Sequence, residues 1–302
     1  MLNGIFPPLT TPFEQGEVAG HRLRQNVRQL NTTGLAGYVV LGSNGEAVSL
    51  SREEKLRVIE TVKEEIPPDR LLIAGTGQES TAATIALTRE AAHRGADMAL
   101  VITPSFFASA MTPRALLEHY TAVAEASPIP ILLYNVPKFT GVNIPPETVA
   151  QLAQHPHIVG IKSSSENLGY LGEIIHRVDE KFAVLVGTAS VLFPGLCLGA
   201  SGGIVALANI APRECVEIFR LTRAGKWEAA RRLQLQLIPV NRAVTAQFGV
   251  SGLKAAMDMR GYFGGAPRPP LLPLDEAHRK TLEDILRSAG LLEATPHNPL
   301  GR

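Results

Sequence analysis

This 302-residue sequence has few cysteines, no long hydrophobic run and no excess of charge of either sign. No stretch reaches about 18 uninterrupted apolar residues, and no basic segment followed by a long apolar one opens the chain, so we expect neither a transmembrane helix nor a secretory signal. The 29 Lys and Arg residues nearly balance the 28 Asp and Glu residues. This balance argues against nucleic acid or a membrane surface as a partner, because either requires clustered positive charge. The two cysteines cannot form a multi-disulfide scaffold, and we expect a cytoplasmic protein.

Short apolar runs rich in Val, Ile and Leu recur along the chain and are continuous rather than alternating. Such runs are typical of strands buried on both faces of a parallel sheet. The eight runs cover residues 4–9, 37–41, 71–74, 98–102, 129–134, 158–161, 183–186 and 203–207. Segments with helical spacing separate them, and eight strand–helix units predict an α/β fold of the (β/α)8 TIM barrel type. An open doubly wound sheet gives the same local alternation, but no dinucleotide-binding fingerprint accompanies it.

Helix start signals support this alternation. Ser51 begins a capping-box pattern, and Thr112 precedes a proline suited to a first helical turn. Ser80 and Ser190 are expected to cap two further helices. The strand signal stops after about residue 224. We therefore expect a barrel over residues 1–224 and a C-terminal helical extension over residues 225–302, with helices at 226–248 and 275–289.

Lysine is scarce, with 8 residues against 21 arginines, and one lysine has an unusual position. Lys162 directly follows the apolar run 158–161, at a strand end, where TIM barrels place their active residues. Burial there favours the neutral amine, which can attack a ketone carbonyl to form a Schiff base. The alternative is a structural lysine paired with a carboxylate such as Glu46. The other lysines fall in predicted helices or loops, where we expect solvated charges.

Two neighbouring strand ends carry groups that suit this chemistry. Tyr134 ends the preceding run, and a phenol can move protons to and from a carbinolamine or a reacting carbon. Its alternative role is that of a rim tyrosine bonded to a backbone carbonyl. The turn Gly-Ser-Asn-Gly-Glu at 42–46 offers backbone N–H groups, the Ser43 hydroxyl and the Asn44 amide to a carboxylate. Its alternative is an ordinary strand-exit turn, since Asn-Gly is a frequent turn pair.

Several other chemistries lack their motifs. The segment 75–80 is neither a GxGxxG motif nor a P-loop, and no GxSxG elbow occurs. The eight histidines fall in helices and loops rather than in a cluster with carboxylates at strand ends. We therefore expect no metal, no nucleotide and no other cofactor.

Three of these motifs together resemble the signatures of the dihydrodipicolinate synthase/N-acetylneuraminate lyase family. They are the turn at 42–46, the Tyr-Asn-Val-Pro segment at 134–137 and the Gly-Ile-Lys segment at 160–162. The resemblance extends over essentially the whole chain. It implies a metal-free class I lyase in which Lys162 forms a Schiff base with a 2-oxo acid, usually pyruvate, and Tyr134 is the general acid/base.

The resemblance also implies the substrate-binding groups and the assembly. Ser43 and Asn44 would bind the carboxylate of the 2-oxo acid, helped by backbone groups at Gly187 and Ile204. Members of the family are commonly homotetramers, built as a dimer of dimers. Within the family, Ser-Asn at 43–44 in place of the usual Thr-Thr makes the sequence most similar to 4-hydroxy-2-oxoglutarate aldolase, which yields pyruvate and glyoxylate. Three alternatives to this function remain. They are a 4-hydroxy-tetrahydrodipicolinate synthase, a 2-keto-3-deoxy sugar acid aldolase or dehydratase, and a barrel that binds a 2-oxo acid without turnover.

Two departures from the family pattern bear on specificity. Dihydrodipicolinate synthases carry an arginine where this sequence has Phe139, preceded by Lys138. We expect Lys138 to reach the second carboxylate of a dicarboxylic substrate, the alternative being a solvated loop lysine. Many members have a Tyr-Tyr pair where this sequence has Phe106 and Phe107, which cannot relay a proton. A relay would then depend on Ser43, Ser105, Thr11 or water.

Overall fold

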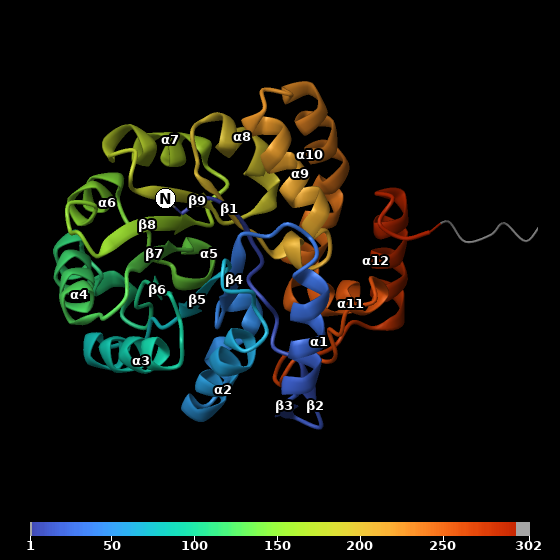
Figure 1. Cartoon of the computed structure of the whole chain (residues 1–302), viewed down its shortest axis with the longest axis horizontal. Helices are drawn as coiled ribbons and strands as arrows, with labels where there is room; N and C mark the ends of the chain where they lie inside the picture. The colour runs from blue at the N-terminus through green and yellow to red at the C-terminus, as the bar shows by residue number, and fades with distance from the viewer. Residues whose placement is uncertain (1, 294–302) are drawn as a thin grey trace, which may run out of the picture.

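Eight parallel strands form a barrel at the centre of the computed structural model, which describes residues 2–293 (Figure 1). The strands are β1 (Gly4–Phe6), β4 (Gly37–Val40), β5 (Leu71–Gly75), β6 (Met98–Ile102), β7 (Ile131–Asn135), β8 (Ile158–Ser163), β9 (Ala183–Val186) and β10 (Gly202–Ile204). Their order in the sheet is β1-β10-β9-β8-β7-β6-β5-β4, and all the neighbouring pairs are parallel. The predicted TIM barrel is confirmed, with one strand in each of the eight apolar runs.

The segment after β1 closes the barrel against β4. Val39 donates its backbone N–H to the carbonyl of Pro7 at 3.0 Å, and Leu9 donates to the carbonyl of Val39 at 2.8 Å. Pro7 and Pro8 have no N–H to donate, so the regular ladder of β1 stops at Phe6 rather than at residue 9. Pro130 has the same effect on the start of β7, which begins at Ile131 instead of residue 129.

Helices surround the strands (Figure 1). They are α1 (Gly20–Leu30), α2 (Arg52–Lys63), α3 (Thr81–His93), α4 (Pro113–Ala126), the single turn α5 (Pro137–Thr140), α6 (Pro146–Leu152), α7 (Leu168–Arg177), α8 (Leu192–Cys197) and α9 (Pro212–Arg223). The capping box at Ser51 and the caps at Ser80 and Thr112 are confirmed. The cap expected at Ser190 is wrong, because Thr188 accepts the hydrogen bond there and Ser190 is its donor.

Three helices follow the barrel and lie on one side of it (Figure 1). They are α10 (Trp227–Arg242), which continues into a π-helical turn (Ala243–Gln247), α11 (Gly249–Met259) and α12 (Glu276–Ser288). The sequence did not predict α11, because its residues from Gly252 to Met257 are all buried and it has no alternating polar face. The part of the expected extension beyond residue 293 lies outside the described residues.

A short hairpin, β2 (Phe13–Glu14) with β3 (Glu17–Val18), was also not predicted. Its two turn residues, Gln15 and Gly16, both have positive φ angles of 52° and 83°. Such a turn matches the twist of a two-residue hairpin, but glutamine is an uncommon residue for the first position. Only one glycine in the sequence therefore indicated this turn, which is why the hairpin was not predicted.

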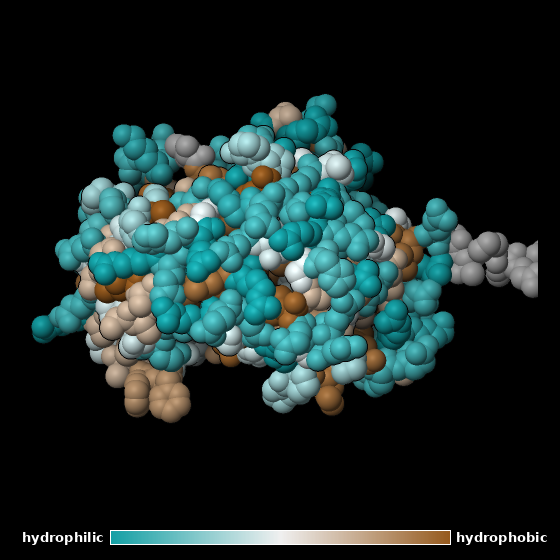
Figure 2. All heavy atoms as spheres, turned by 60° about the horizontal axis from the view of Figure 1, so that its bottom comes forward, coloured by the Kyte–Doolittle hydropathy of each residue, from teal (hydrophilic) through white to brown (hydrophobic). Residues whose placement is uncertain are grey.

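Large apolar side chains are exposed at one end of the barrel. Figure 2 shows a face that is mainly hydrophilic, with a few apolar side chains standing out at its lower edge. The exposed apolar residues include Val48, Phe106, Phe107 and Phe139, in segments that follow β4, β6 and β7. Since the carboxyl ends of parallel strands meet at one end of a barrel, these four residues share that end. Among residues 2–293, no helix is both long and apolar enough to cross a membrane.

Candidate active site

Tyr134 and Lys162 are register partners on neighbouring strands, β7 and β8. Because paired residues of parallel strands point to the same face, both side chains enter the barrel interior. Tyr134 belongs to a buried cluster whose residues lie in the strands or within two residues of them, and not in the surrounding helices, which places it inside the barrel. The Lys162 Nζ atom lies 4.1 Å from the centroid of the Tyr134 ring. The residues predicted from two separate strand ends therefore meet, both almost fully buried.

The turn after β4 brings a hydroxyl to the same place. Ser43 to Gly45 form a 3₁₀ turn, which Glu46 ends in the left-handed region with a φ of 54°. The Ser43 Oγ atom lies 3.3 Å from the Tyr134 hydroxyl, within hydrogen-bonding distance. Thr11 donates its hydroxyl to the carbonyl of Gly45 at 2.7 Å, which holds the turn from its far side.

A cavity of about 440 Å³ opens onto these groups. Of the predicted site residues, it is lined by Ser43, Asn44, Tyr134, Lys138, Phe139, Lys162 and Gly187. Ile204 does not line it; its side chain is fully buried in the barrel interior. Within the described part of the chain, no group of three or more His, Cys, Asp or Glu residues could hold a metal ion.

Sequence reasoning missed several polar residues of this cavity. Ser164 and Glu166 follow β8, Thr188 follows β9, and Thr245 comes from the π-helical turn after α10. The first three could have been found, because they lie in the segments that follow predicted strands. Thr245 could not, since a π-helical turn has no sequence signature and lies more than 200 residues from Ser43 along the chain.

The electrostatics of the cavity act on the Tyr134 phenol. Burial alone would raise its pKa, but the charge of Lys162 and hydrogen bonding to Ser43, Lys162 and Ser164 act in the opposite direction. The net pKa of Tyr134 is lowered from the ordinary value for a tyrosine. A phenol of this kind gives up its proton more readily than a solvated one, as a general base requires.

Two of the three hydroxyls expected to replace the tyrosine relay do not reach Tyr134. Thr11 donates to the Gly45 carbonyl, and Ser105 donates to the Glu79 carboxylate at 2.9 Å. Only Ser43 among the three contacts the phenol. Phe106 and Phe107 do not line the cavity; they are exposed and packed edge to face, with ring centroids 5.0 Å apart.

The structural alternative for Lys162, an ion pair with Glu46, is not formed. Glu46 pairs instead with Lys254 of α11, with 2.6 Å between Oε1 and Nζ, and both side chains are fully buried. The expectation that the other lysines carry solvated charges is therefore wrong for Lys254. Burial lowers the pKa of Lys254, and the contact with Glu46 only partly offsets this effect.

Comparison with known proteins shows to which family the chain belongs. The model of the dihydrodipicolinate synthetase family matches residues 1–289. The chain belongs to this family. A 4-hydroxy-tetrahydrodipicolinate synthase of Methanothrix thermoacetophila is 40% identical over 290 residues, which is 95% of this chain and 96% of that protein.

Solved structures of the dihydrodipicolinate synthase family agree with this assignment. The dihydrodipicolinate synthase of Thermotoga maritima superimposes with a TM-score of 0.93 at 30% identity, over 97% of this chain and all of that chain. A prophage protein of the family from E. coli K12, solved in complex with pyruvate, superimposes with a TM-score of 0.91 at 28% identity, over 96% and 99% of the two chains. The family comprises class I lyases, so this chain is an enzyme of that class. The Methanothrix relative is named a synthase, so the similarity of this chain to 4-hydroxy-2-oxoglutarate aldolase stays a prediction.

Proposed function

We propose that the enzyme cleaves 4-hydroxy-2-oxoglutarate to pyruvate and glyoxylate through a Schiff base on Lys162. The neutral amine attacks the 2-oxo carbon, water leaves, and the protonated imine withdraws electrons from the neighbouring carbons. Tyr134 takes the proton of the 4-hydroxyl group while the bond between C3 and C4 breaks. Glyoxylate departs, and the electron pair of the broken bond forms a pyruvate enamine on Lys162. Protonation at C3 and hydrolysis then release pyruvate and the free amine.

The observation that carries this proposal is the meeting of three groups in one cavity. Lys162 supplies the amine, Tyr134 lies against it with a lowered pKa, and Ser43 contacts the phenol from the turn after β4. The backbone N–H groups of that turn and the Asn44 amide, at the cavity wall, would hold the substrate carboxylate next to the 2-oxo carbon. The backbone at Gly187, and that at Ile204, would complete this carboxylate site.

The second carboxylate of the substrate is assigned to Lys138. This residue lines the cavity and is also exposed, as expected for a residue at the cavity mouth. Phe139 follows it in the sequence, at the position where synthases of the family have an arginine. We expect Lys138→Ala to raise KM for 4-hydroxy-2-oxoglutarate about tenfold or more while leaving kcat within a factor of two or three. An unchanged KM would mean that Lys138 is a solvated loop residue.

A second candidate is synthesis of 4-hydroxy-tetrahydrodipicolinate, the activity in the name of the Methanothrix relative. In that reaction the imine of pyruvate on Lys162 would lose a proton from its methyl carbon to give the same enamine, which would then attack the aldehyde carbon of an amino-aldehyde acid. The two candidates share the enamine on Lys162 and differ in the aldehyde that it releases or attacks.

The test has two stages. Borohydride added with pyruvate would reduce the imine to a stable secondary amine, and peptide mass spectrometry would place the label on Lys162. Lys162→Ala should abolish labelling, and the matched variant Lys63→Ala should not. If the wild type takes up no label, the Schiff-base proposal fails. Rates of 4-hydroxy-2-oxoglutarate cleavage and of the condensation, compared as kcat/KM, would then decide the reaction.

We propose a homotetramer as the assembly and the cytoplasm as the location. The exposed Phe106 and Phe107, whose rings pack against each other, and the exposed Val48 at the same end of the barrel support self-association, because exposed apolar groups favour burial against a partner. Sedimentation of the wild type against a Phe106→Ser/Phe107→Ser variant tests this assembly. An unchanged mass in the variant would remove these residues from the interface.

A further inference from the structure

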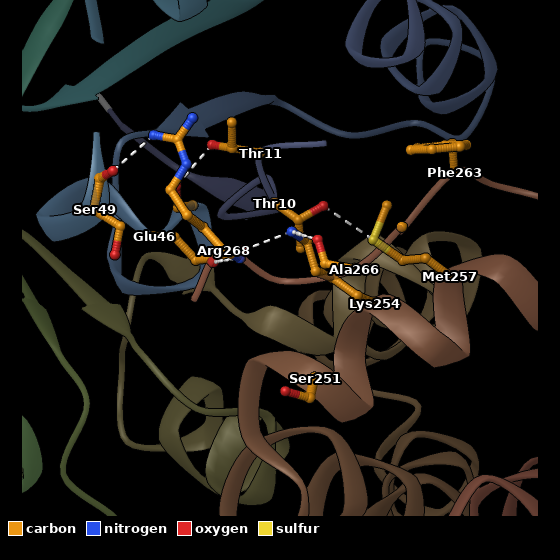
Figure 3. Close-up of polar contacts among 12 residues, drawn as sticks. Thr10, Thr11, Glu46, Ser49, Ser251, Lys254, Met257, Phe263, Ala266 and Arg268 are labelled. Atoms are coloured by element: carbon orange, nitrogen blue, oxygen red, sulfur yellow. Dashed lines mark hydrogen bonds and ion pairs between the residues drawn. The ribbon is translucent and has the colours of Figure 1, made fainter. Parts of the chain in front are cut away.

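A buried charge cluster joins the C-terminal extension to the turn that carries Ser43 and Asn44. Figure 3 shows Lys254 reaching from α11 toward Glu46, the residue that ends this turn. Glu46 accepts from Lys254 through Oε1 at 2.6 Å and from the backbone N–H of Arg268 through Oε2 at 2.8 Å. Both carboxylate oxygens are therefore held by residues that follow the barrel in the sequence.

The cluster also makes hydrogen bonds to the segment that follows the turn. The Arg268 guanidinium donates to the carbonyl of Ser49 at 2.7 Å and forms a bidentate pair with Glu54, both bonds 2.7 Å long (Figure 3 shows the bond to Ser49). Lys254 donates a second hydrogen bond to the carbonyl of Ala266 at 3.0 Å. The segment from Glu46 to Glu54 is thus fixed at three points by α11 and the chain that follows it.

The backbone of the turn needs such support. Glu46 has a φ of 54°, a conformation that costs free energy in a residue other than glycine and that persists only when the surroundings impose it. The two contacts on its carboxylate and the bond from Thr11 to the Gly45 carbonyl impose it from three sides. None of these three contacts reaches the cavity, so their effect on substrate passes through the turn.

We propose that Lys254 is a positioning residue for the carboxylate of the 2-oxo acid, acting through Glu46 on the turn at Ser43 and Asn44. The inference rests on the proposed function of that turn. Without Lys254, Glu46 loses the partner that fixes its side chain, and the N–H groups and side chains of the turn lose their alignment. An error of about 1 Å in such a site can lower a rate about a hundredfold. The extension is then part of the active site although Lys254 does not touch the substrate.

A comparison of two ligands separates positioning from general damage to the fold. Pyruvate has the carboxylate, whereas methyl pyruvate keeps the ketone and lacks the negative charge. Rates of borohydride trapping on Lys162 are measured for both ligands with the wild type, Lys254→Met and the isosteric Glu46→Gln, at a temperature where circular dichroism shows each variant folded. Lys63→Met is the matched control, because it removes a lysine that is paired with a carboxylate, Asp97, at 3.0 Å near the other end of the barrel.

The expected result is a loss confined to pyruvate. In Lys254→Met the ratio of the pyruvate rate to the methyl pyruvate rate falls about tenfold or more, in Glu46→Gln it falls less, and in Lys63→Met it is unchanged. Equal losses for both ligands, or an unchanged ratio in both site variants, would overturn the inference while leaving the Schiff base in place. A wild type that is trapped by neither ligand would overturn the proposed function itself.

Discussion

Lys254→Met should destabilise the protein far more than the loss of an ordinary surface lysine. Lys254 and Glu46 are fully buried and 2.6 Å apart, so the variant leaves a carboxylate in the interior with only the N–H of Arg268 as a partner. Removing one member of a buried ion pair costs about 3–5 kcal/mol. Breaking the half-exposed pair of Lys63 with Asp97 should cost about 1 kcal/mol or less.

A second substitution should recover part of this loss. Glu46→Gln in the Lys254→Met background removes the unpaired charge and keeps an oxygen for the Arg268 N–H. The Ala266 carbonyl then remains without its donor, at a cost of about 1–3 kcal/mol, so the double variant should be about 2 kcal/mol more stable than Lys254→Met alone.

Urea unfolding at pH 7 and 25 °C measures these differences. It should be followed at two protein concentrations, because an oligomer gains apparent stability with concentration. If Glu46→Gln destabilises Lys254→Met further, an unpaired buried charge is not the cause of the loss, and the reasoning fails. The same holds if Lys254→Met costs no more than Lys63→Met.

Three further predictions follow from single contacts. Tyr134→Phe should lower kcat by about 10²–10⁴ and remove from the pH–rate profile a limb that lies below the ordinary tyrosine pKa; a profile that keeps this limb would exclude the phenol as its source. The hydrogen bonds from Arg268 lower the pKa of Glu54, so this carboxylate stabilises the fold above about pH 4.3 and the stability is lost as the pH falls through its lower folded pKa; Glu54→Gln should flatten urea midpoints over that window. Gly75→Ala would place a Cβ 2.1 Å from the carbonyl oxygen of Leu41, directly after β4, and should lower the unfolding free energy by more than about 3 kcal/mol. Gly172→Ala in α7 meets no atom within 4 Å outside the backbone of its own helix and should change the unfolding free energy by about 1 kcal/mol or less, as thermal melts would show.

The barrel was predictable because its strands are buried on both faces, and a run of apolar residues records such burial directly. Errors at strand ends came from prolines: Pro7 and Pro130 are apolar enough to extend a run, but they cannot extend a hydrogen-bond ladder. The helix α11 was missed for the opposite reason. Burial on most of its sides removes the polar face that reveals a helix in a sequence, and its glycines lower the helical propensity further.

The two buried lysines, Lys162 and Lys254, also show which positions a sequence reveals and which it does not. Lys162 was identified because a strand end is a position that the sequence reveals, and the register with Tyr134 follows from neighbouring strands. Lys254 stands among apolar residues too, but its partner is 208 residues away, and spacing carries no information about such a contact. The partners then decide the roles. Lys254 is paired with Glu46 and does not line the cavity. Among residues 2–293 no carboxylate pairs with Lys162, which lines the cavity beside a phenol. A buried lysine is therefore a candidate nucleophile only where its surroundings leave the amine open to a substrate.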